Sequence, residues 1–426
     1  MRVHQTPHHQ PDHNLPEKLR HQPDHKPDRK PNHQPDRKLN HQLPTRALLP
    51  LATAVFLTSL TETLPAGVLP GLSAGLGVGE PAAGQAVTVY ALGTALTAIP
   101  LSAATSGWGR KRLLLTAMAG FAVANTVTAV SASYPLTMAA RFVAGVAAGL
   151  AWALLAGYAR GLAPEPLRGK AIALVMTGIP VALSFGVPAG TFAGDAFGWR
   201  APFFAMTVLA VGTIAWIAAL VPDRPGRRHE KAPVLRALTV PGVTPVLAVT
   251  LVFVLAHTIL YTYVATFLST LGLGGQTDLV LLVFGLASLV SIAVVGAHIH
   301  RRLRVLTLAG AVLVAVAAAV LALTGGSPAL VYVAAALWGL GWGGVPTLLQ
   351  TAAADAGGEQ ADAAQAMLVT LWNAAMAAGG VAGGILLDAF GARVFPWTVL
   401  VLLAPVLAVV VSARGHGFPR ARTTAA

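Results

Sequence analysis

The chain has 426 residues, of which 55% are hydrophobic and only 11% are charged, with a net charge of +13. Apolar runs recur about every thirty to forty residues, a pattern that soluble domains do not show, so composition excludes a soluble enzyme and indicates a polytopic membrane protein. The absence of cysteine excludes a disulfide framework, a thiolate metal site and a cysteine nucleophile.

Residues 1–45 differ from the rest of the chain. His-Gln-Pro-Asp occurs at positions 9, 21 and 33, proline recurs every few residues, and no apolar periodicity is present. Such a segment cannot bury a core, so we predict a disordered, low-complexity tail, or alternatively translated sequence upstream of the true start. Its histidines alternate with proline instead of presenting a fixed ligand geometry, so we predict no metal site.

Twelve apolar segments follow Arg46, most of them reaching the ~20 residues that a membrane-spanning helix needs. We therefore predict an all-α membrane protein with twelve transmembrane helices. The charged connection within 222–239 divides them into six-helix bundles at 46–221 and 240–414, followed by a tail at 415–426. The segments are 47–70, 83–105, 112–132, 135–158, 170–193, 201–221, 240–267, 277–298, 305–324, 328–351, 363–387 and 395–413.

The basic residues fall on one side of these segments. If the amino end is inside, the inner loops and both tails hold all of the 29 Lys and Arg except Arg141, Arg200 and Arg393. This is the positive-inside pattern, so we predict that both termini are cytoplasmic. The same pattern accounts for the high net charge without a nucleic-acid partner.

The two bundles repeat each other in sequence. Residues 195–200 (DAFGWR) return as 388–393 (DAFGAR), 193 positions later, and residues 110–114 are echoed by 302–306 at a separation of 192. Each bundle thus carries the same parts in the same order and orientation. Parallel six-helix repeats are typical of a rocking transporter, whose site lies between the halves near the midplane.

Glu62 is the only formally charged residue between Ala47 and Gly79. At about 1.5 Å of rise per residue, it lies about 24 Å above Arg46, while Arg141 lies about 10 Å below the opposite surface, so both fall at similar depth. Desolvation favours a neutral acid and a nearby arginine favours an ionised one, so we predict that Glu62 and Arg141 couple transport to protons. The alternative is a permanent ion pair that fixes helices 1 and 4.

Polar and aromatic side chains inside the segments are candidates for the substrate path, since a mostly apolar cavity with few directed polar groups suits amphipathic molecules. Each is also compatible with packing or interhelical hydrogen bonding, as are Trp338 and Trp342 on one helix face. A histidine here could titrate near neutral pH or stay neutral against a hydroxyl group. The candidates are Tyr90, Asn125, His257, Tyr261, Tyr263, Trp342, Gln350, Trp372 and Asn373.

Several motifs resemble those of the major facilitator superfamily, in its twelve-helix drug:proton antiporter branch. Residues 62–70 (ETLPAGVLP) look like the first-helix signature of that superfamily, and the fourth-helix motif is matched by Arg141, Gly145 and Gly149. Residues 261–264 and 372–384 look like those of arabinose-efflux-type and chloramphenicol-resistance permeases. The fifth-helix motif associated with antiport is resembled by Gly178, Gly186, Pro188 and Gly190. Glycines in this spacing also suit close helix packing, and prolines bend helices.

The loop after segment 2 departs from the superfamily pattern. Ser106 and Gly107 stand where an acidic residue and a basic residue are usual, so the contact that latches the cytoplasmic face is weakened or made elsewhere. Arg110 and Arg112 remain candidates for contacts with phosphate headgroups or helix ends, or act as plain topology signals.

The resemblance covers about residues 46–414. It implies a monomeric, proton-coupled antiporter of the cell membrane that exports small amphipathic compounds, including an antibiotic such as chloramphenicol, by alternating access and without a cofactor. A sugar or nucleoside efflux permease with the same coupling is the alternative. A membrane-embedded enzyme is disfavoured because the sequence has no HExxH pair and no Gly-rich phosphate loop preceding Lys-Ser/Thr.

Overall fold

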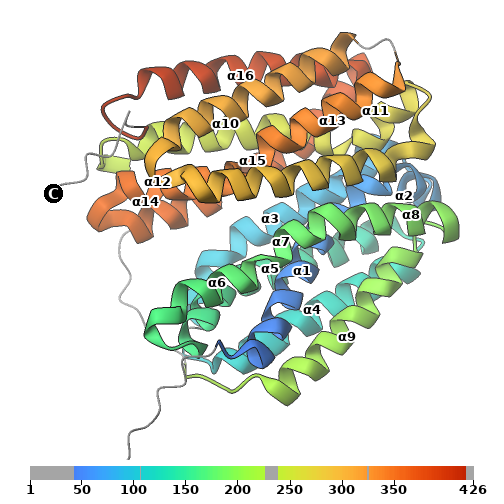
Figure 1. The fold of residues 1–426 in the computed structure, drawn as a ribbon. Helices are drawn as coiled ribbons and strands as arrows, with labels where there is room; N and C mark the ends of the chain where they lie inside the picture. The colour runs from blue at the N-terminus through green and yellow to red at the C-terminus, as the bar shows by residue number, and fades with distance from the viewer. Residues whose placement is uncertain (1–42, 106, 226–237, 324–325, 419–426) are drawn as a thin grey trace, which may run out of the picture. The chain divides into compact units, whose positions relative to one another are not determined.

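The computed structural model describes residues 43–105, 107–225, 238–323 and 326–418. The predicted tail up to residue 42, most of the predicted linker and the last eight residues lie outside this part of the chain. The described residues belong to one compact unit and form helices joined by short turns, without strands (Figure 1). The predicted all-α fold class is therefore confirmed.

The N-terminal half comprises the helices up to α9 and the C-terminal half those from α10 onward (Figure 1). Their bounds are α1 (Thr45–Gly67), α2 (Leu69–Leu76), α3 (Glu80–Ala104), α4 (Arg110–Val130), α5 (Tyr134–Leu162), η1 (Glu165–Leu167), α6 (Arg168–Met176), α7 (Gly178–Val181), η2 (Ala182–Gly186), α8 (Val187–Phe197), α9 (Ala201–Leu220), α10 (Val243–Thr262), α11 (Val264–Thr270), η4 (Gly274–Gln276), α12 (Thr277–Leu323), α13 (Pro328–Trp342), α14 (Val345–Gly357), η5 (Gly358–Gln360), α15 (Ala361–Phe390), η6 (Ala392–Val394) and α16 (Phe395–Ser412).

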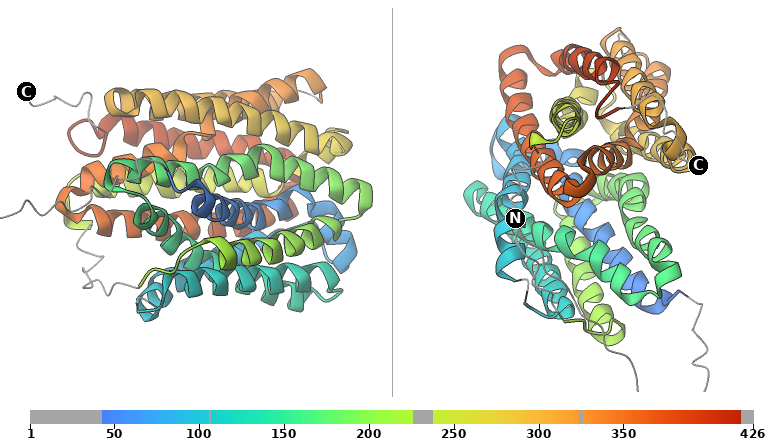
Figure 2. Two further views of the ribbon diagram at one scale, coloured as in Figure 1. Left: turned by 60° about the horizontal axis from the view of Figure 1, so that its bottom comes forward. Right: turned by 90° about the vertical axis from the view of Figure 1, so that its left-hand side faces the viewer.

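Eleven helical stretches among the described residues are long and apolar enough to cross a membrane. The remaining predicted segment corresponds to α3, a helix of 25 residues that packs against α5 and α15. The long helices run along a common direction, which is seen from the side and nearly end-on in the two views of Figure 2. Twelve helical passes thus match the twelve predicted segments.

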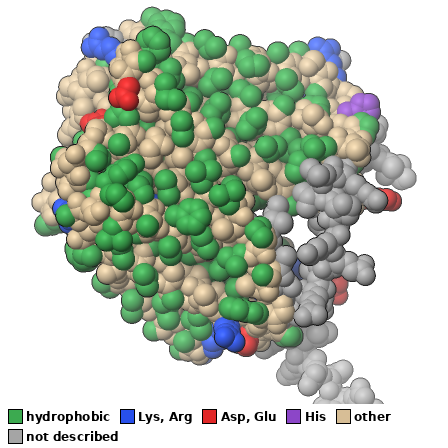
Figure 3. Space-filling model, turned by 180° about the vertical axis from the view of Figure 1, so that it is seen from behind, with side chains coloured by type: hydrophobic (Ala, Val, Ile, Leu, Met, Phe, Trp, Pro, Cys, Tyr) green, Lys and Arg blue, Asp and Glu red, His purple; other side chains and the backbone are tan. Residues whose placement is uncertain are grey.

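Large apolar side chains cover the outside of the bundle. Phe192 is 57% exposed, Val208 73%, Leu323 74% and Val401 71%. Figure 3 shows one face on which hydrophobic side chains predominate, while the charged ones lie toward its margins. A surface of this kind is unfavourable in water and suits contact with lipid tails, so the chain is a multi-pass membrane protein.

The first and seventh membrane spans are each broken near one end, a feature absent from the predicted segments. The break between α1 and α2 falls at Val68 (φ −114°, ψ 18°), and that between α10 and α11 falls at Tyr263 (φ −110°, ψ 22°). These positions are 195 residues apart, close to the separations of the sequence repeats. The same irregularity therefore recurs at equivalent places in the two halves.

The repeat also extends to helix packing. A Cβ atom on Gly145 would lie 2.0 Å from the Tyr90 carbonyl oxygen, and one on Gly339 would lie 2.2 Å from the Phe284 carbonyl oxygen. Both pairs are related by a shift of 194 positions. Glycine thus allows the same close backbone contact in each half, between α3 and α5 and between α12 and α13, which supports the predicted pair of parallel repeats.

The predicted segments 8 and 9 form a single labelled helix, α12. Arg302 has non-helical dihedrals (φ −133°, ψ 27°) and separates its two membrane-crossing parts, Gly274–Ile299 and Arg301–Leu323. The sequence predicts a loop between 298 and 305, but in the structure a kink at Arg302 joins the two spans.

We call the end of the bundle where α1 and α15 finish the Gly67 end. The hydrogen bonds found between the halves lie nearer to this end. The opposite end, where α1 begins and α16 finishes, is called the Thr45 end. The bonds between halves run from Thr88 Oγ1 to Ala377 O (3.3 Å), from Gln85 Nε2 to Gly380 O (3.4 Å), from Ser184 Oγ to Gly285 O (2.7 Å), from Tyr263 Oη to Pro81 O (3.4 Å) and from Thr266 Oγ1 to Glu80 Oε2.

Candidate functional site

Helix α1 carries the acid at the centre of the N-terminal half. Glu62 is partly buried, and its carboxylate has no hydrogen bond or ion pair within the described residues. Its oxygens are also absent from the fully buried atoms that lack a partner, so they face accessible space. An acid in this setting is free to bind a proton or a substrate group.

Arg141 lies near Glu62 but is held by the backbone. Its Nη2 donates to the Thr61 carbonyl oxygen (2.7 Å), and its Nε donates to the Ala86 carbonyl oxygen (3.2 Å). The guanidinium also lies 5.0 Å from the centre of the Tyr90 ring, an arrangement that stabilises a desolvated cation. Arg141 thus joins α5 to α1 and α3 without requiring an ion pair with Glu62.

The charges of Glu62 and Arg141 interact electrostatically, but no nitrogen–oxygen pair between them lies within 4.0 Å in this part of the chain. The permanent ion pair considered from the sequence is therefore not present in this conformation. Arg141 is only 1% exposed, and its Nη1 has no hydrogen-bond partner. An unpaired buried donor is costly, so Arg141 keeps an unmet hydrogen-bonding capacity in this conformation.

Thr61 connects these groups. Besides accepting from Arg141 at its carbonyl, it accepts from Asn125 Nδ2 at its hydroxyl oxygen (3.3 Å), and that hydroxyl donates to Met206 Sδ (3.7 Å). The Asn125 Oδ1 atom is buried and has no partner. Thr61 therefore anchors α4, α5 and α9 to α1 beside Glu62, a role that the sequence analysis missed.

The other half presents aromatic rings in place of charges. The His257 ring on α10 stacks on Trp342 with centroids 3.6 Å apart and 5° between planes, and it stacks on Tyr261 at 5.2 Å. Trp338 Nε1 donates to His257 Nδ1 (3.1 Å), and Trp372 lies 5.8 Å from Trp342. We call His257, Tyr261, Trp338, Trp342 and Trp372 the aromatic cluster.

The acid and the aromatic cluster lie on neighbouring helices. Helix α1 packs against α10, and Tyr261 lies within electrostatic range of Glu62. His257 follows Glu62 by 195 residues, the same separation as the two helix breaks at Val68 and Tyr263. Glu62 and His257 therefore occupy equivalent positions in the two repeats.

Tyr263, Asn373 and Gln350 make their contacts outside this centre, whereas Tyr90 lies against Arg141. Tyr263 is fully buried near the Gly67 end, where its hydroxyl donates to Gly380 O (2.9 Å) and its ring packs on Phe395. Asn373 donates to Val369 on its own helix (2.9 Å), and Gln350 is exposed in the middle of α14, where its carbonyl oxygen accepts from Gln365. Tyr90 is fully buried and donates to Thr58 O (3.2 Å).

The glycines of the fifth span form a stripe against α1. Added Cβ atoms would meet Ala52 O from Gly178 (2.4 Å), Phe56 from Gly186 (2.9 Å) and Leu64 from Gly190 (2.4 Å). Between them, η2 is a turn of π-helix that leads to Pro188 at the start of α8. The stripe thus brings α1 close to the fifth span, while Gly149 is buried within α5.

The loop after α3 is held by an acid from elsewhere in its own half. Asp223, beyond α9, accepts from the Lys111 backbone N–H (3.0 Å), and the Arg110 N–H donates to Arg224 O (2.8 Å). Arg112 lies over the Trp108 ring at 4.9 Å. Ser106 lies outside the described residues. Asp223, which follows α9, supplies an acidic side chain that contacts the start of α4, just after this loop.

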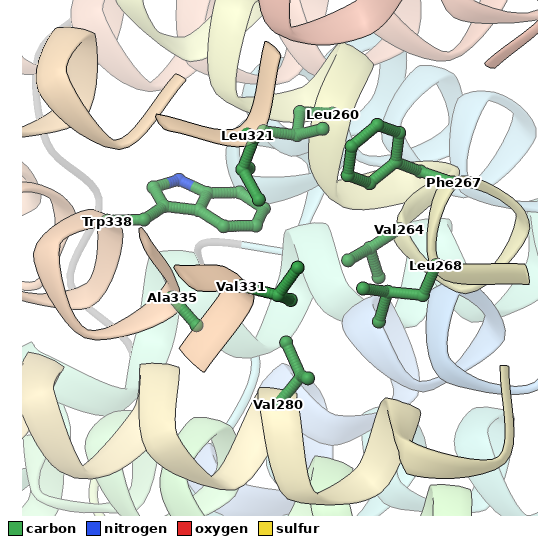
Figure 4. Close-up of a pocket in the computed structure, with 9 residues that line it drawn as sticks. All are labelled: Leu260, Val264, Phe267, Leu268, Val280, Leu321, Val331, Ala335 and Trp338. Carbon is green, nitrogen blue, oxygen red and sulfur yellow. The ribbon is translucent and has the colours of Figure 1, made fainter. Parts of the chain in front are cut away.

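The small cavity in Figure 4 is separate from this centre. Its 9 lining residues, including Leu260, Phe267 and Trp338, are all apolar and come from the C-terminal half. It includes neither Glu62 nor Arg141, so it is an apolar void behind the aromatic cluster. Within the described residues, no group of three or more His, Asp or Glu side chains is placed to hold a metal ion.

Two parallel six-helix repeats that enclose polar side chains in an apolar bundle are typical of a membrane transporter. The model of the Major Facilitator Superfamily matches residues 51–380, and the chain belongs to that superfamily. The human organic anion transporter MFSD10 (TETRAN) has a similar fold, with a TM-score of 0.64 and 17% identity over 87% of this chain and 100% of its own.

Two curated bacterial proteins are similar over most of the chain. The purine ribonucleoside efflux pump NepI of Escherichia coli (strain K12) is 29% identical over 350 residues, which are 81% of this chain and 88% of NepI. The transcription regulatory protein OpdE of Pseudomonas aeruginosa is 29% identical over 372 residues, which are 85% of this chain and 92% of OpdE.

Proposed function

We propose that this transporter exports a small organic substrate in exchange for protons and that Glu62 carries the proton. The observation that carries the proposal is the accessible, unpaired carboxylate on α1, next to an arginine that other groups hold in place. Similarity to an efflux pump supports the direction of transport. The positive-inside pattern supports a cell-membrane location with both termini cytoplasmic, and we propose that a monomer is sufficient.

Coupling follows from competition at one site. An ionised Glu62 is attracted to Arg141 and to polar or cationic substrate groups, and protonation removes that attraction. The other titratable side chains around Glu62 are Tyr90 on α3 and Tyr261 on α10, with His257 at the equivalent position of the second repeat. Proton binding from outside therefore releases substrate, and proton loss to the cytoplasm restores the binding form.

The substrate class that we favour is purine nucleosides. The aromatic cluster offers stacking surfaces to a planar base, and NepI is named a purine ribonucleoside efflux pump. This favours the nucleoside alternative over the antibiotic that the motif resemblance implied. Chloramphenicol remains the second compound to be tested.

Proteoliposomes with an imposed pH gradient test the proposal. In an antiport, substrate accumulates in the acidic compartment, because protons leave that compartment as substrate enters. We expect labelled inosine to accumulate inside vesicles with an acidic lumen, and a protonophore to abolish the accumulation. Chloramphenicol is tested in a parallel arm.

Glu62→Gln is the decisive variant. We expect it to abolish uphill accumulation while leaving the protein folded, because glutamine keeps the shape of the side chain but cannot exchange a proton. Glu165→Gln is the matched control, since Glu165 is exposed and forms only a surface ion pair with Arg168 (3.5 Å). Uphill accumulation by Glu62→Gln at the wild-type level would refute proton coupling at this residue.

A further inference from the structure

His257 is packed into the aromatic cluster on several sides. Trp342 covers one face of its ring in a nearly parallel stack, and Phe284 lies 6.2 Å from it. Trp338 approaches the ring edge and places its indole nitrogen 3.1 Å from Nδ1. These contacts fix both the plane of the imidazole and the direction in which its free edge points.

The bond from Trp338 also fixes the tautomer. An indole N–H can only donate a hydrogen bond, so His257 Nδ1 must accept it with its lone pair. The ring proton of the neutral imidazole is then on Nε2. His257 is therefore a neutral side chain whose remaining polar group is a hydrogen-bond donor.

This donor is free and accessible. Among the described residues, His257 Nε2 has no hydrogen-bond partner, and it is absent from the fully buried atoms that lack one. The residue is 9% exposed, so the small exposed part includes this edge of the ring. Trp372, which contacts Trp342, is also only partly buried.

The position of His257 in the second repeat corresponds to that of Glu62 in the first. The Glu62 carboxylate is likewise accessible and unpaired. Glu62 on α1 interacts electrostatically with Tyr261, one turn along α10 from His257, and the neighbours of the His257 ring on α10, α12 and α13 are the uncharged Tyr261, Phe284, Trp338 and Trp342. A neutral donor among aromatic rings suits an uncharged planar ring that carries an acceptor atom.

We infer that His257 is a specificity-determining residue of the transport site, which donates its Nε2–H to a ring nitrogen of a purine base while the partly exposed Trp372 stacks on that base. The inference rests on the proposed function and assigns the chemical feature that the site recognises. A site built around a hydrogen bond rejects an analogue that lacks the acceptor, because its own donor is then left unpaired.

The test is equilibrium binding to the purified full-length protein in lipid nanodiscs, without a gradient. The probes are adenosine, 7-deazaadenosine and 3-deazaadenosine, in which a C–H group replaces one ring nitrogen. We expect wild type to bind at least one analogue at least about tenfold more weakly than adenosine. His257→Phe should bind adenosine as weakly as that analogue and lose the discrimination, whereas His257→Gln, which retains an N–H donor, should recover part of it.

His298→Phe is the matched control, because His298 is an exposed histidine on α12 whose ring contacts only its own helix at Val294 O (2.9 Å). This variant should bind all three compounds as wild type does. Thermal melting checks the folding of each variant, and His257→Gln remains informative if His257→Phe does not fold.

Four results would overturn the inference. The first is that His257→Phe binds adenosine as tightly as wild type does, the second is that wild type binds all three compounds equally, and the third is that wild type does not bind adenosine. A fourth is an equal loss of all three compounds in His257→Phe and His257→Gln, which would indicate packing alone. Discriminating binding without uphill transport would instead leave the inference standing and refute the proposed proton-coupled export.

Discussion

Thr61 explains how an arginine can lie beside an acid in an apolar bundle without neutralising it. The Thr61 carbonyl accepts from Arg141 Nη2, and its hydroxyl oxygen accepts from Asn125 Nδ2. Because the arginine is held by neutral oxygens, Glu62 can gain or lose a proton without releasing the structural contact between α1 and α5. The acid is therefore available for titration, which a tight ion pair would oppose.

Arg141→Lys tests this arrangement. Arg141 reaches the carbonyls of Thr61 and Ala86 on two different helices with two nitrogens of one planar group, and a lysine ammonium cannot reproduce that geometry. We expect destabilisation by about 1–3 kcal/mol, the cost of a buried unpaired acceptor. The measurement is thermal melting in detergent, with the exposed Arg168→Lys as the control. Unchanged melting of Arg141→Lys would show that the two carbonyl contacts contribute little.

The sequence was sufficient to single out the titratable residues of the site but not their partners. Glu62, Arg141 and His257 are conspicuous because polar groups are costly in a membrane. Thr61 is one of many threonines, most of which bond to the preceding turn of their own helix, so its bridging role depends on tertiary packing. The bond from Trp338 to His257 likewise requires the placement of α10 against α13.

At the level of the helices, the glycine contacts give a sharp prediction. Gly145→Ala would place its Cβ atom 2.0 Å from the Tyr90 backbone oxygen, so α3 and α5 must separate. Overpacking of this kind costs about 1–3 kcal/mol. Gly339→Ala should cost a similar amount, since it meets the Phe284 backbone oxygen at 2.2 Å in the second repeat.

Gly157→Ala provides the control on the same helix as Gly145. Nothing lies within 4 Å of its added Cβ atom, so alanine should leave stability unchanged or raise it by up to about 1 kcal/mol through helix propensity. The measurement is the melting temperature of Gly145→Ala, Gly339→Ala and Gly157→Ala, each compared with wild type. Equal effects at positions 145 and 157 would mean that the close contact between α3 and α5 is not required.

Helix positions could be predicted well because hydrophobic length is a strong signal. The break at Val68 has a sequence signal that was overlooked, because Gly67 precedes it and Pro70 follows it, whereas no proline or glycine adjoins Tyr263 and nothing in the sequence indicates that break. The kink at Arg302 was likewise expected as a loop, because basic residues mark a membrane boundary but do not reveal how tightly the chain turns.

The molecule as a whole offers a direct test of orientation, because it contains no cysteine. Ser133, before α5, lies at the Gly67 end, and Ser412, at the end of α16, lies at the Thr45 end. We expect a membrane-impermeant maleimide to label Ser133→Cys in intact cells and Ser412→Cys only after permeabilisation. The opposite pattern would reverse the proposed topology.

The contacts between the halves also predict how the conformational equilibrium can be shifted. In Gly285→Ala, the added Cβ atom would lie 2.3 Å from Ser184 Cα, which opposes closure at the Gly67 end. A cysteine at the buried Ala377 should then be labelled faster from that side, because the open state is more populated. Gly296→Ala on the same helix, with nothing within 4 Å of its Cβ atom, should leave the labelling rate unchanged.

The equivalence of Glu62 and His257 has a consequence for leakage. Two residues at matching places in duplicated bundles reach the same depth, so a rocking motion exposes them to the same solution at the same moment. A proton on Glu62 and a purine base beside His257 would then reach the solution through the same opening. Under the proposed exchange, this shared timing would couple release of the proton to release of the substrate and leave neither with a separate path across the membrane.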